Sequence, residues 1–283
     1  MLIFILRKAR IAKSPVFRLH LADISGAMHR CAMIASLMMY ARPELQTAHA
    51  SLWDCLRSSL DRRGIASPPT LAQNAPEMDV WQDPTLVFSQ TCGMPYRTRL
   101  HDTVQLVCTP DYGLEGCKGG YYNSAIVVRA DDARLSLPDY ESAILAYNSG
   151  DSQSGFAAIY HHTRAEGFWF NDRVQSGGHL NSARMVAEGK ADIAALDAQT
   201  WRLIRRYEPM AEHLRVLEFT EPTPALPYIT GPQHNPDVVF DAVTEALFNL
   251  PSEDAAALDL RGVVRIPHAD YAAVPTPPAA ALT

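Results

Sequence analysis

The sequence lacks the marks of a metal-binding, membrane-spanning or nucleic-acid-binding protein. Its five cysteines form no C-x-x-C pair, so the usual pattern of a zinc site or a dithiol redox centre is missing. No apolar run reaches the roughly 18 residues that a membrane-spanning helix needs. The formal net charge is −6 and the 25 Lys and Arg residues are scattered, whereas nucleic-acid-binding chains carry a basic stripe. We therefore expect no metal, no cofactor and no nucleic-acid partner.

The first 32 residues have neither the pattern of a secretory leader nor that of a domain. The apolar run 2–6 precedes the basic residues Arg7, Lys8 and Arg10, whereas a leader places its basic residues first. We expect residues 1–32 to be a poorly structured extension, which a start codon assigned too far upstream would explain.

The size and composition suit a folded protein of ordinary surface charge. With 283 residues, of which 47% are hydrophobic, the chain can form one large domain or two smaller lobes. Cys92, Cys108 and Cys117 lie in one loop-rich stretch. A single disulfide among them fits an exported protein, and free buried thiols fit the spacing equally well.

Short apolar runs alternate with stretches of helical spacing. The run 33–39 predicts a buried strand, and the spacing of apolar residues over 44–63 predicts a helix that ends at Gly64. Further apolar runs predict strands at 86–88, 104–107, 125–129, 144–147, 193–196, 214–219 and 228–230. This alternation indicates an α/β fold with mixed, mostly parallel sheets flanked by helices.

Two loops of small polar residues precede predicted helices. One contains Ser152, Gln153 and Ser154, and the other runs from Ser176 to His179. A helix N-terminus has unpaired N–H groups and partial positive charge, so such loops can bind an anion. Capping alone explains either loop. Because parallel strands bring both loops to the same edge of a sheet, the pair favours a shared anion site.

Asp197 follows the apolar strand 193–196, at the end where ligands of α/β proteins gather. A carboxylate repels a fully ionised anion but accepts a hydrogen bond from a protonated one. Asp197 would then admit phosphate or a phosphonate and reject sulfate. The alternative is that Asp197 only caps the helix that contains Trp201 and Leu203.

Three further side chains are candidate donors to an oxyanion. Tyr40 and Tyr96 lie on loops and each carries a hydroxyl on a rigid ring, although a single Tyr is more often a packing residue. His179 can donate to the anion or cap its helix. The pair His161 and His162 is expected on a solvated helix surface, without a metal.

At these residues the sequence resembles the periplasmic phosphate, phosphite and phosphonate substrate-binding proteins of ABC transporters, which have the type II periplasmic-binding-protein fold. The likeness covers about residues 33–272. Six stretches carry it: MIASLMMYARPE (33–44), QTCGMPYRT (90–98), TPDYGLEGCKGGYYNSAIVVR (109–129), AYNSGDSQSGF (146–156), SGGHLNSARMVAEGKADIAALDAQTW (176–201) and PTPALPYITG (222–231).

The resemblance implies a ligand held between two lobes, no catalytic residue and no enzyme activity. The ligand-binding residues that it implies are Tyr40, Tyr96, Ser152, Gln153, Ser154, His179 and Asp197. Gln153 stands where characterised phosphonate binders carry a hydroxyl, which leaves the oxyanion open among phosphate, phosphite and a phosphonate.

The resemblance also implies an organisation and a setting. Lobe 1 is expected to comprise residues 33–124 and 223–272, lobe 2 residues 125–222, and residues 273–283 a loose tail. The protein is expected to be a periplasmic monomer that delivers its ligand to an ABC permease.

Three alternatives stay open at this point. The first is a binding protein of the same fold for a sulfonate or a thiamin-precursor pyrimidine. The second is a hydrolase that uses His179 and Asp197 as a base pair, although the sequence has no G-x-S-x-G elbow. The third is a cytoplasmic sensory module.

Overall fold

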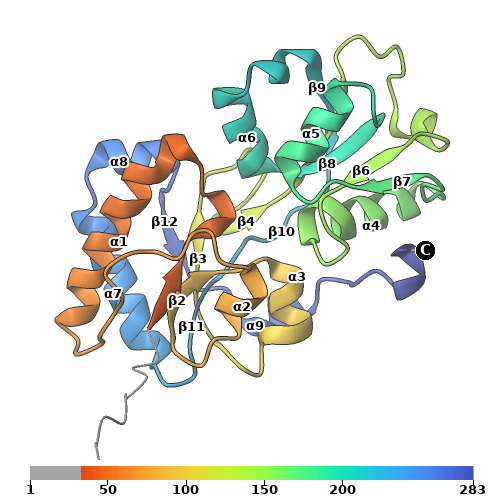
Figure 1. Cartoon of the computed structure of the whole chain (residues 1–283). Coiled ribbons are helices and arrows are strands. Elements are labelled where there is room, and N and C mark those ends of the chain that lie inside the picture. The colour runs from red at the N-terminus through yellow and green to blue at the C-terminus, as the bar shows by residue number, and fades with distance from the viewer. Residues whose placement is uncertain (1–32, 283) are drawn as a thin grey trace, which may run out of the picture. The chain divides into compact units, whose positions relative to one another are not determined.

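The computed structural model describes residues 33–282 (Figure 1). Most of these residues belong to two mixed β-sheets and to the helices that cover both faces of each sheet. The expected extension, residues 1–32, lies outside the described residues. The first sheet has the order β1-β2-β11-β3-β12 and the second β7-β6-β8-β5-β9.

The strands of the first sheet come from two separate parts of the chain: β1 (Ile34–Ser36), β2 (Leu86–Gln90), β3 (Gln105–Asp111), β11 (Tyr228–Thr230) and β12 (Gly262–Val264). Those of the second sheet come from the stretch in between: β5 (Ser124–Arg129), β6 (Leu145–Tyr147), β7 (Arg173–Gln175), β8 (Ile193–Asp197) and β9 (Leu214–Phe219). In Figure 1 the labelled strands of the second sheet, β6 to β9, are green to cyan.

Parallel pairing occurs only at one end of each sheet, among the described strands that come first in the strand order given above. β1 pairs with β2 in parallel, and β6 pairs in parallel with both β7 and β8. The pairings of β11, β12, β5 and β9 are antiparallel. The prediction of mostly parallel sheets is therefore right only for part of each sheet, because β5, which follows the outward connection, and β11 and β12, which follow the return, run against the other strands.

The second sheet is buried on both faces, and β5 shows why. Ala125 and Val127 pack on one side with α5 (His179–Ala187) and α6 (Ala198–Tyr207). Ile126 and Val128 pack on the other side with α4 (Ala158–Ala165). Side chains alternate along a strand, so a continuous apolar run such as this one requires cover on both faces.

The first sheet is covered in the same way. One face packs against α1 (Gln46–Asp61), α7 (Pro236–Asn249) and α8 (Ser252–Ala257). The other packs against α2 (Glu77–Trp81), the π-helical turn Tyr96–Leu100 that follows α3 (Gly93–Pro95), and α9 (His268–Ala272). The predicted helix 44–63 is confirmed as α1. The predicted strand 33–39 is shorter, because a 3₁₀ turn occupies Met38–Tyr40.

Two chain segments connect the sheets, and they pair with each other. β4 (Tyr121–Tyr122) lies on the outward connection and β10 (Thr223–Pro224) on the return. They form a two-stranded antiparallel ribbon in which Thr223 is opposite Tyr122. Both connections therefore pass between the sheets side by side.

The end of the described chain makes specific contacts. Trp169 donates from Nε1 to the carbonyl of Ala281 over 3.2 Å, and Ala281 is buried. Arg97 donates to Thr276 Oγ1 over 3.2 Å. This placement differs from the loose tail that the sequence predicts, because the sequence does not show that the prolines and alanines have buried partners.

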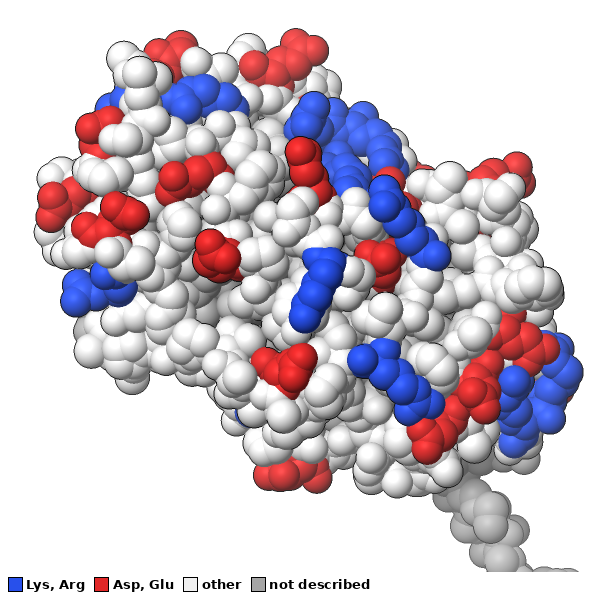
Figure 2. Space-filling model, turned by 180° about the vertical axis from the view of Figure 1, so that it is seen from behind, with Lys and Arg blue, Asp and Glu red and all other residues white. Residues whose placement is uncertain are grey.

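Basic and acidic side chains lie among one another on the face of the molecule shown in Figure 2. Several pairs are within bonding distance, such as Arg206 with Asp259 at 2.6 Å. Within residues 33–282, no helix is both long enough and apolar enough to cross a membrane.

Candidate functional site

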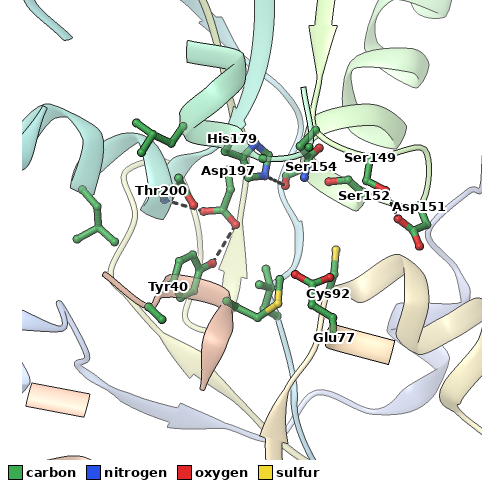
Figure 3. A pocket seen from close by; sticks show the side chains of 18 of the residues that line it. Tyr40, Glu77, Cys92, Ser149, Asp151, Ser152, Ser154, His179, Asp197 and Thr200 are labelled. Carbon is green, nitrogen blue, oxygen red and sulfur yellow. Dashed lines mark hydrogen bonds between the residues drawn. The ribbon is translucent and has the colours of Figure 1, made fainter. Parts of the chain in front are cut away.

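A cavity of about 300 Å³ lies between the two sheets and is lined from both (Figure 3). The first sheet and its connections contribute Met39, Tyr40, Ala41, Arg42, Glu77, Cys92, Pro95 and Leu226. The second contributes Asn148, Ser149, Asp151, Ser152, Ser154, Gly177, Gly178, His179, Leu180, Asp197, Thr200 and Leu203. The second sheet places its polar groups there because β7, β6 and β8 are parallel and end at the same edge.

The loop after β6 supplies two serine hydroxyls. Ser152 Oγ accepts a hydrogen bond of 3.0 Å from the backbone N–H of Gly155 and so caps the π-helical turn Gln153–Ala157. This bond uses an acceptor lone pair of Ser152 and leaves its O–H to donate. Ser154 Oγ lies 2.9 Å from His179 Nε2. Figure 3 shows these side chains together on one wall.

Gly155 allows the two polar loops to approach. A Cβ atom at this position would lie 1.9 Å from Asn148 Oδ1 and 3.0 Å from His179 Cε1. Any larger residue would therefore displace either Asn148 or His179. The glycine of the first loop is thus needed for contact with the second.

His179 is the first residue of α5 and is a neutral donor or acceptor. Burial lowers its pKa to about 4, because the interior disfavours the imidazolium. A hydrogen bond to the backbone of Ala195 opposes that effect without cancelling it. His179 therefore brings no positive charge to the cavity near neutral pH.

Asp197 ends β8 and has two roles at once. Its Oδ1 accepts from the backbone N–H groups of Gln199 at 2.8 Å and Thr200 at 2.9 Å, which caps α6. Its Oδ2 accepts from Tyr40 Oη at 2.9 Å. Desolvation raises the pKa of Asp197 to about 6, although all three hydrogen bonds lower it. The capping interpretation is right, and the same side chain also lines the cavity.

Tyr40 reaches Asp197 from the opposite sheet. It ends the 3₁₀ turn Met38–Tyr40, and its ring packs edge-on against Tyr112 with centroids 5.2 Å apart. Its hydroxyl is thereby aimed across the cavity, as Figure 3 shows. The Tyr40–Asp197 bond joins the two sheets.

The cavity offers no free positive charge. Arg42 is the only Lys or Arg among the described lining residues, and it pairs with Glu208 at 2.7 Å and Glu44 at 3.3 Å. Glu77 and Asp151 also line the cavity, and burial together with the charge of Asp151 raises the pKa of Glu77. An anion would have to be held by neutral donors.

Two of the predicted site residues are not brought to the cavity. Tyr96 is buried, and its hydroxyl lies 3.1 Å from His268 Nδ1 on the far face of the first sheet. Gln153 is buried but does not line the cavity, and its backbone N–H donates to Cys92 Sγ of the opposite sheet at 3.4 Å. Successive residues of a helical turn point in different directions, so Ser152 and Ser154 face the cavity while Gln153 does not.

Several lining residues were not among the predicted ones. Asn148 and Ser149 follow β6 directly, and Thr200 lies in the first turn of α6. The rule that polar residues after parallel strands converge would have found Asn148 and Ser149. Cys92 had no such signal. It is free, as are the other described cysteines, Cys55, Cys108 and Cys117.

The comparison with protein families decides the class of the chain. The model of the ABC-transporter phosphonate periplasmic substrate-binding proteins matches residues 87–273, more than half of the sequence. The chain belongs to this family. Membership implies a phosphonate-type ligand and a membrane permease as partner. No curated protein matches the chain.

Solved structures show the same fold at low sequence identity. PhnD1 from Prochlorococcus marinus in complex with methylphosphonate has a TM-score of 0.67 at 12% identity, covering 84% of this chain and 94% of that one. A binding protein component of an ABC phosphonate transporter from Pseudomonas aeruginosa has a TM-score of 0.62 at 16% identity, with coverages of 82% and 80%. A Xanthomonas citri protein bound to ATP has 0.61 at 16% identity, with 83% and 92%.

These likenesses establish the fold, which is that of the type II periplasmic binding proteins. The family match establishes that the chain is a substrate-binding protein of the transport type. The predicted resemblance is thereby confirmed.

Proposed function

We propose that the protein captures a small phosphorus oxyanion that still carries a proton, such as phosphite or the monoanion of a phosphonate. The observation that supports this most is Asp197, a buried carboxylate that faces Ser152, Ser154 and His179 across one cavity. Neutral donors bind the ionised oxygens of the ligand, and the carboxylate accepts the remaining P–OH proton.

The charges of the cavity support a monoanion over a dianion. Arg42 is already paired with two carboxylates, and His179 is neutral. A fully ionised dianion would meet Asp197 without a counter-charge, which costs free energy in a desolvated site. Sulfate is fully ionised at neutral pH and is the anion that this arrangement disfavours.

Ligand binding would replace the contact between Tyr40 and Asp197. When the P–OH group donates to Asp197 Oδ2, the hydroxyl of Tyr40 is released to donate to a ligand oxygen. One ligand then touches both sheets, so its binding energy stabilises the closed arrangement of two lobes. In this proposal residues 33–124 with 223–272 form one lobe and 125–222 the other.

We further propose that the chain acts as a periplasmic monomer, without catalysis, and passes its ligand to an ABC permease. The family match supports this. Ser154 Oγ lies 2.9 Å from His179 Nε2, but the nearby carboxylate of Asp197 bonds Tyr40, Gln199 and Thr200 and does not orient His179 as in a catalytic triad.

A thermal-shift screen tests the ligand. The purified protein would be heated with phosphate, phosphite, methylphosphonate, aminoethylphosphonate or sulfate at neutral pH. A ligand that binds the folded state raises the melting temperature with the logarithm of its concentration. We expect a shift with at least one phosphorus oxyanion and none with sulfate. A shift with sulfate alone would contradict the proposal.

A further inference from the structure

The last part of the described chain runs from the first sheet to the second. Residues 275–282, named the strap here, follow α9 and end in the 3₁₀ turn Ala279–Leu282 beside the second sheet (Figure 1). They lie beyond residue 273, where the family match ends. The strap is therefore a connection in addition to the two that carry β4 and β10.

Arg97 anchors the strap to the first sheet. It lies in the π-helical turn after β2, and its side chain is largely buried. Its Nε donates to Thr276 Oγ1 at 3.2 Å and its Nη2 to the carbonyl of Pro275 at 3.0 Å. His161, on α4 of the second sheet, also hydrogen-bonds to the backbone of Pro275. The two sheets thus meet at Pro275.

The second anchor lies behind the ligand loop. Trp169 Nε1 donates to the carbonyl of Ala281 at 3.2 Å, and the Trp169 ring packs edge-on against Phe156 with centroids 5.6 Å apart. Phe156 belongs to the same π-helical turn as Ser154. The Leu282 side chain covers Gly150, where an added Cβ would lie 2.6 Å from Leu282 Cδ2. The strap thereby supports the loop that presents Ser152 and Ser154.

We propose that the strap is a third tie between the lobes that favours the closed form and slows ligand release. Separation of the lobes moves Arg97 away from Trp169, so one of the two anchors must break before the cavity opens. The strap contacts join the two sheets on either side of the cavity, so their free energy shifts the population toward the arrangement in which the sheets stay together. The effect on ligand release rests on the proposed function, whereas the effect on lobe opening does not.

Two variants of the strap and one control test this proposal. The first deletes residues 275–283, and the second is Trp169→Phe, which keeps a smaller aromatic ring and removes the indole N–H donor. The control is Trp53→Phe. Trp53 donates to the carbonyl of Pro68 at the same distance, 3.2 Å, but lies within the core of the first sheet. It makes the same chemical change without touching the strap.

Two measurements are made on each protein. Small-angle X-ray scattering of the ligand-free protein reports how far the lobes open, and a chase experiment measures the release of radiolabelled methylphosphonate. We expect a larger radius of gyration and a release rate about 10-fold faster for the deletion, and about 3-fold faster for Trp169→Phe, the loss of one neutral hydrogen bond. Trp53→Phe should change neither.

The possible outcomes distinguish a failure of the strap proposal from a failure of the proposed function. If both strap variants match Trp53→Phe in scattering and in release, the strap proposal is wrong. If the unmodified protein binds no methylphosphonate or other phosphorus oxyanion, the proposed function is wrong. The scattering comparison then still decides whether the strap holds the lobes together.

Discussion

The two sheets contribute different chemistry to the same cavity. The second sheet supplies hydroxyl, imidazole and carboxylate groups, which follow three parallel strands directly. The first sheet supplies mainly apolar walls, such as Met39, Pro95 and Leu226. Its Tyr40 hydroxyl and its Arg42 guanidinium bond carboxylates on the other side, those of Asp197 and Glu208. In the proposed function, the second sheet would therefore hold the oxyanion and the first would cover it.

This difference between the sheets predicts which substitutions weaken ligand binding most. A group on the second sheet would be in contact with the ligand in the open and the closed form, whereas a group on the first sheet contacts it only after closure. Removing a donor of the second sheet should therefore weaken binding more than removing one of the first. The predictions below test that ranking from the largest effect to the smallest.

Ser152→Ala should have the largest effect. It removes a donor to a desolvated oxyanion, and a hydrogen bond to a charged group contributes about 1.5–3 kcal/mol, so affinity for the best phosphorus oxyanion should fall about 10- to 100-fold. Calorimetric titration measures this. Ser58→Ala is the control, because Ser58 Oγ bonds only within α1, to Asp54 O at 2.9 Å. Equal affinities for the two variants would remove Ser152 from the site.

Asp197→Asn should change selectivity about 10-fold. Asn presents an N–H₂ group where the P–OH proton needs an acceptor, so phosphite affinity falls while sulfate gains. Competition titrations of phosphite against sulfate measure the ratio. An unchanged ratio would show that Asp197 serves only as the cap of α6.

The same substitution should raise the stability of the ligand-free protein at pH 7. The native pKa of Asp197 is about 6, whereas the ordinary value of an aspartate side chain is 3.8. A raised native pKa gives stability that is present below pH 4 and lost as pH rises through 6. The loss is about 3 kcal/mol at 1.36 kcal/mol per pKa unit, and Asn avoids it. Urea unfolding from pH 4 to pH 8 should show the two proteins diverging between these values. Parallel curves for the two would contradict the prediction.

Tyr40→Phe should weaken binding less, about 5-fold, because the variant also loses the Tyr40–Asp197 bond of the free protein, which partly offsets the lost bond to the ligand. Tyr112→Phe is a matched control in the same aromatic pair, since Tyr112 Oη bonds Gln90 and does not line the cavity. Calorimetry compares the two. A larger loss for Tyr40→Phe than for Ser152→Ala would reverse the ranking of the sheets.

Tyr96→Phe should have the smallest effect on binding, less than about 2-fold, because its hydroxyl bonds His268 outside the cavity. The free energy of unfolding should fall by about 1 kcal/mol with the lost hydrogen bond. Binding and urea unfolding are measured on the same preparation. Loss of binding without loss of stability would place Tyr96 back in the site.

The sequence predicted the site residues whose position depends on the strand that directly precedes them in the chain. Ser152, Ser154, His179 and Asp197 each follow a strand, and parallel pairing of β6 with β7 and β8 brings those strand ends together. The strands 214–219 and 228–230 are confirmed as β9 and β11, because buried apolar runs with clear ends leave little choice of boundary.

What the sequence could not predict depends on how distant segments pack. The direction of the Tyr96 side chain is set by His268 and Tyr271, far along the chain. The pairing of Arg42 with Glu208 joins residues 166 positions apart and removes a charge that the sequence alone would leave available to an anion. The order of strands in each sheet, and hence the antiparallel pairings, follows from the crossing of the chain between the sheets.

The ribbon of β4 and β10 has a mechanical consequence. Two separate strands could bend independently, but hydrogen-bonded strands must bend as one plate. Pro224 stiffens that plate further, since its ring fixes φ. Any motion of one half of the molecule against the other therefore has to bend both connecting segments together.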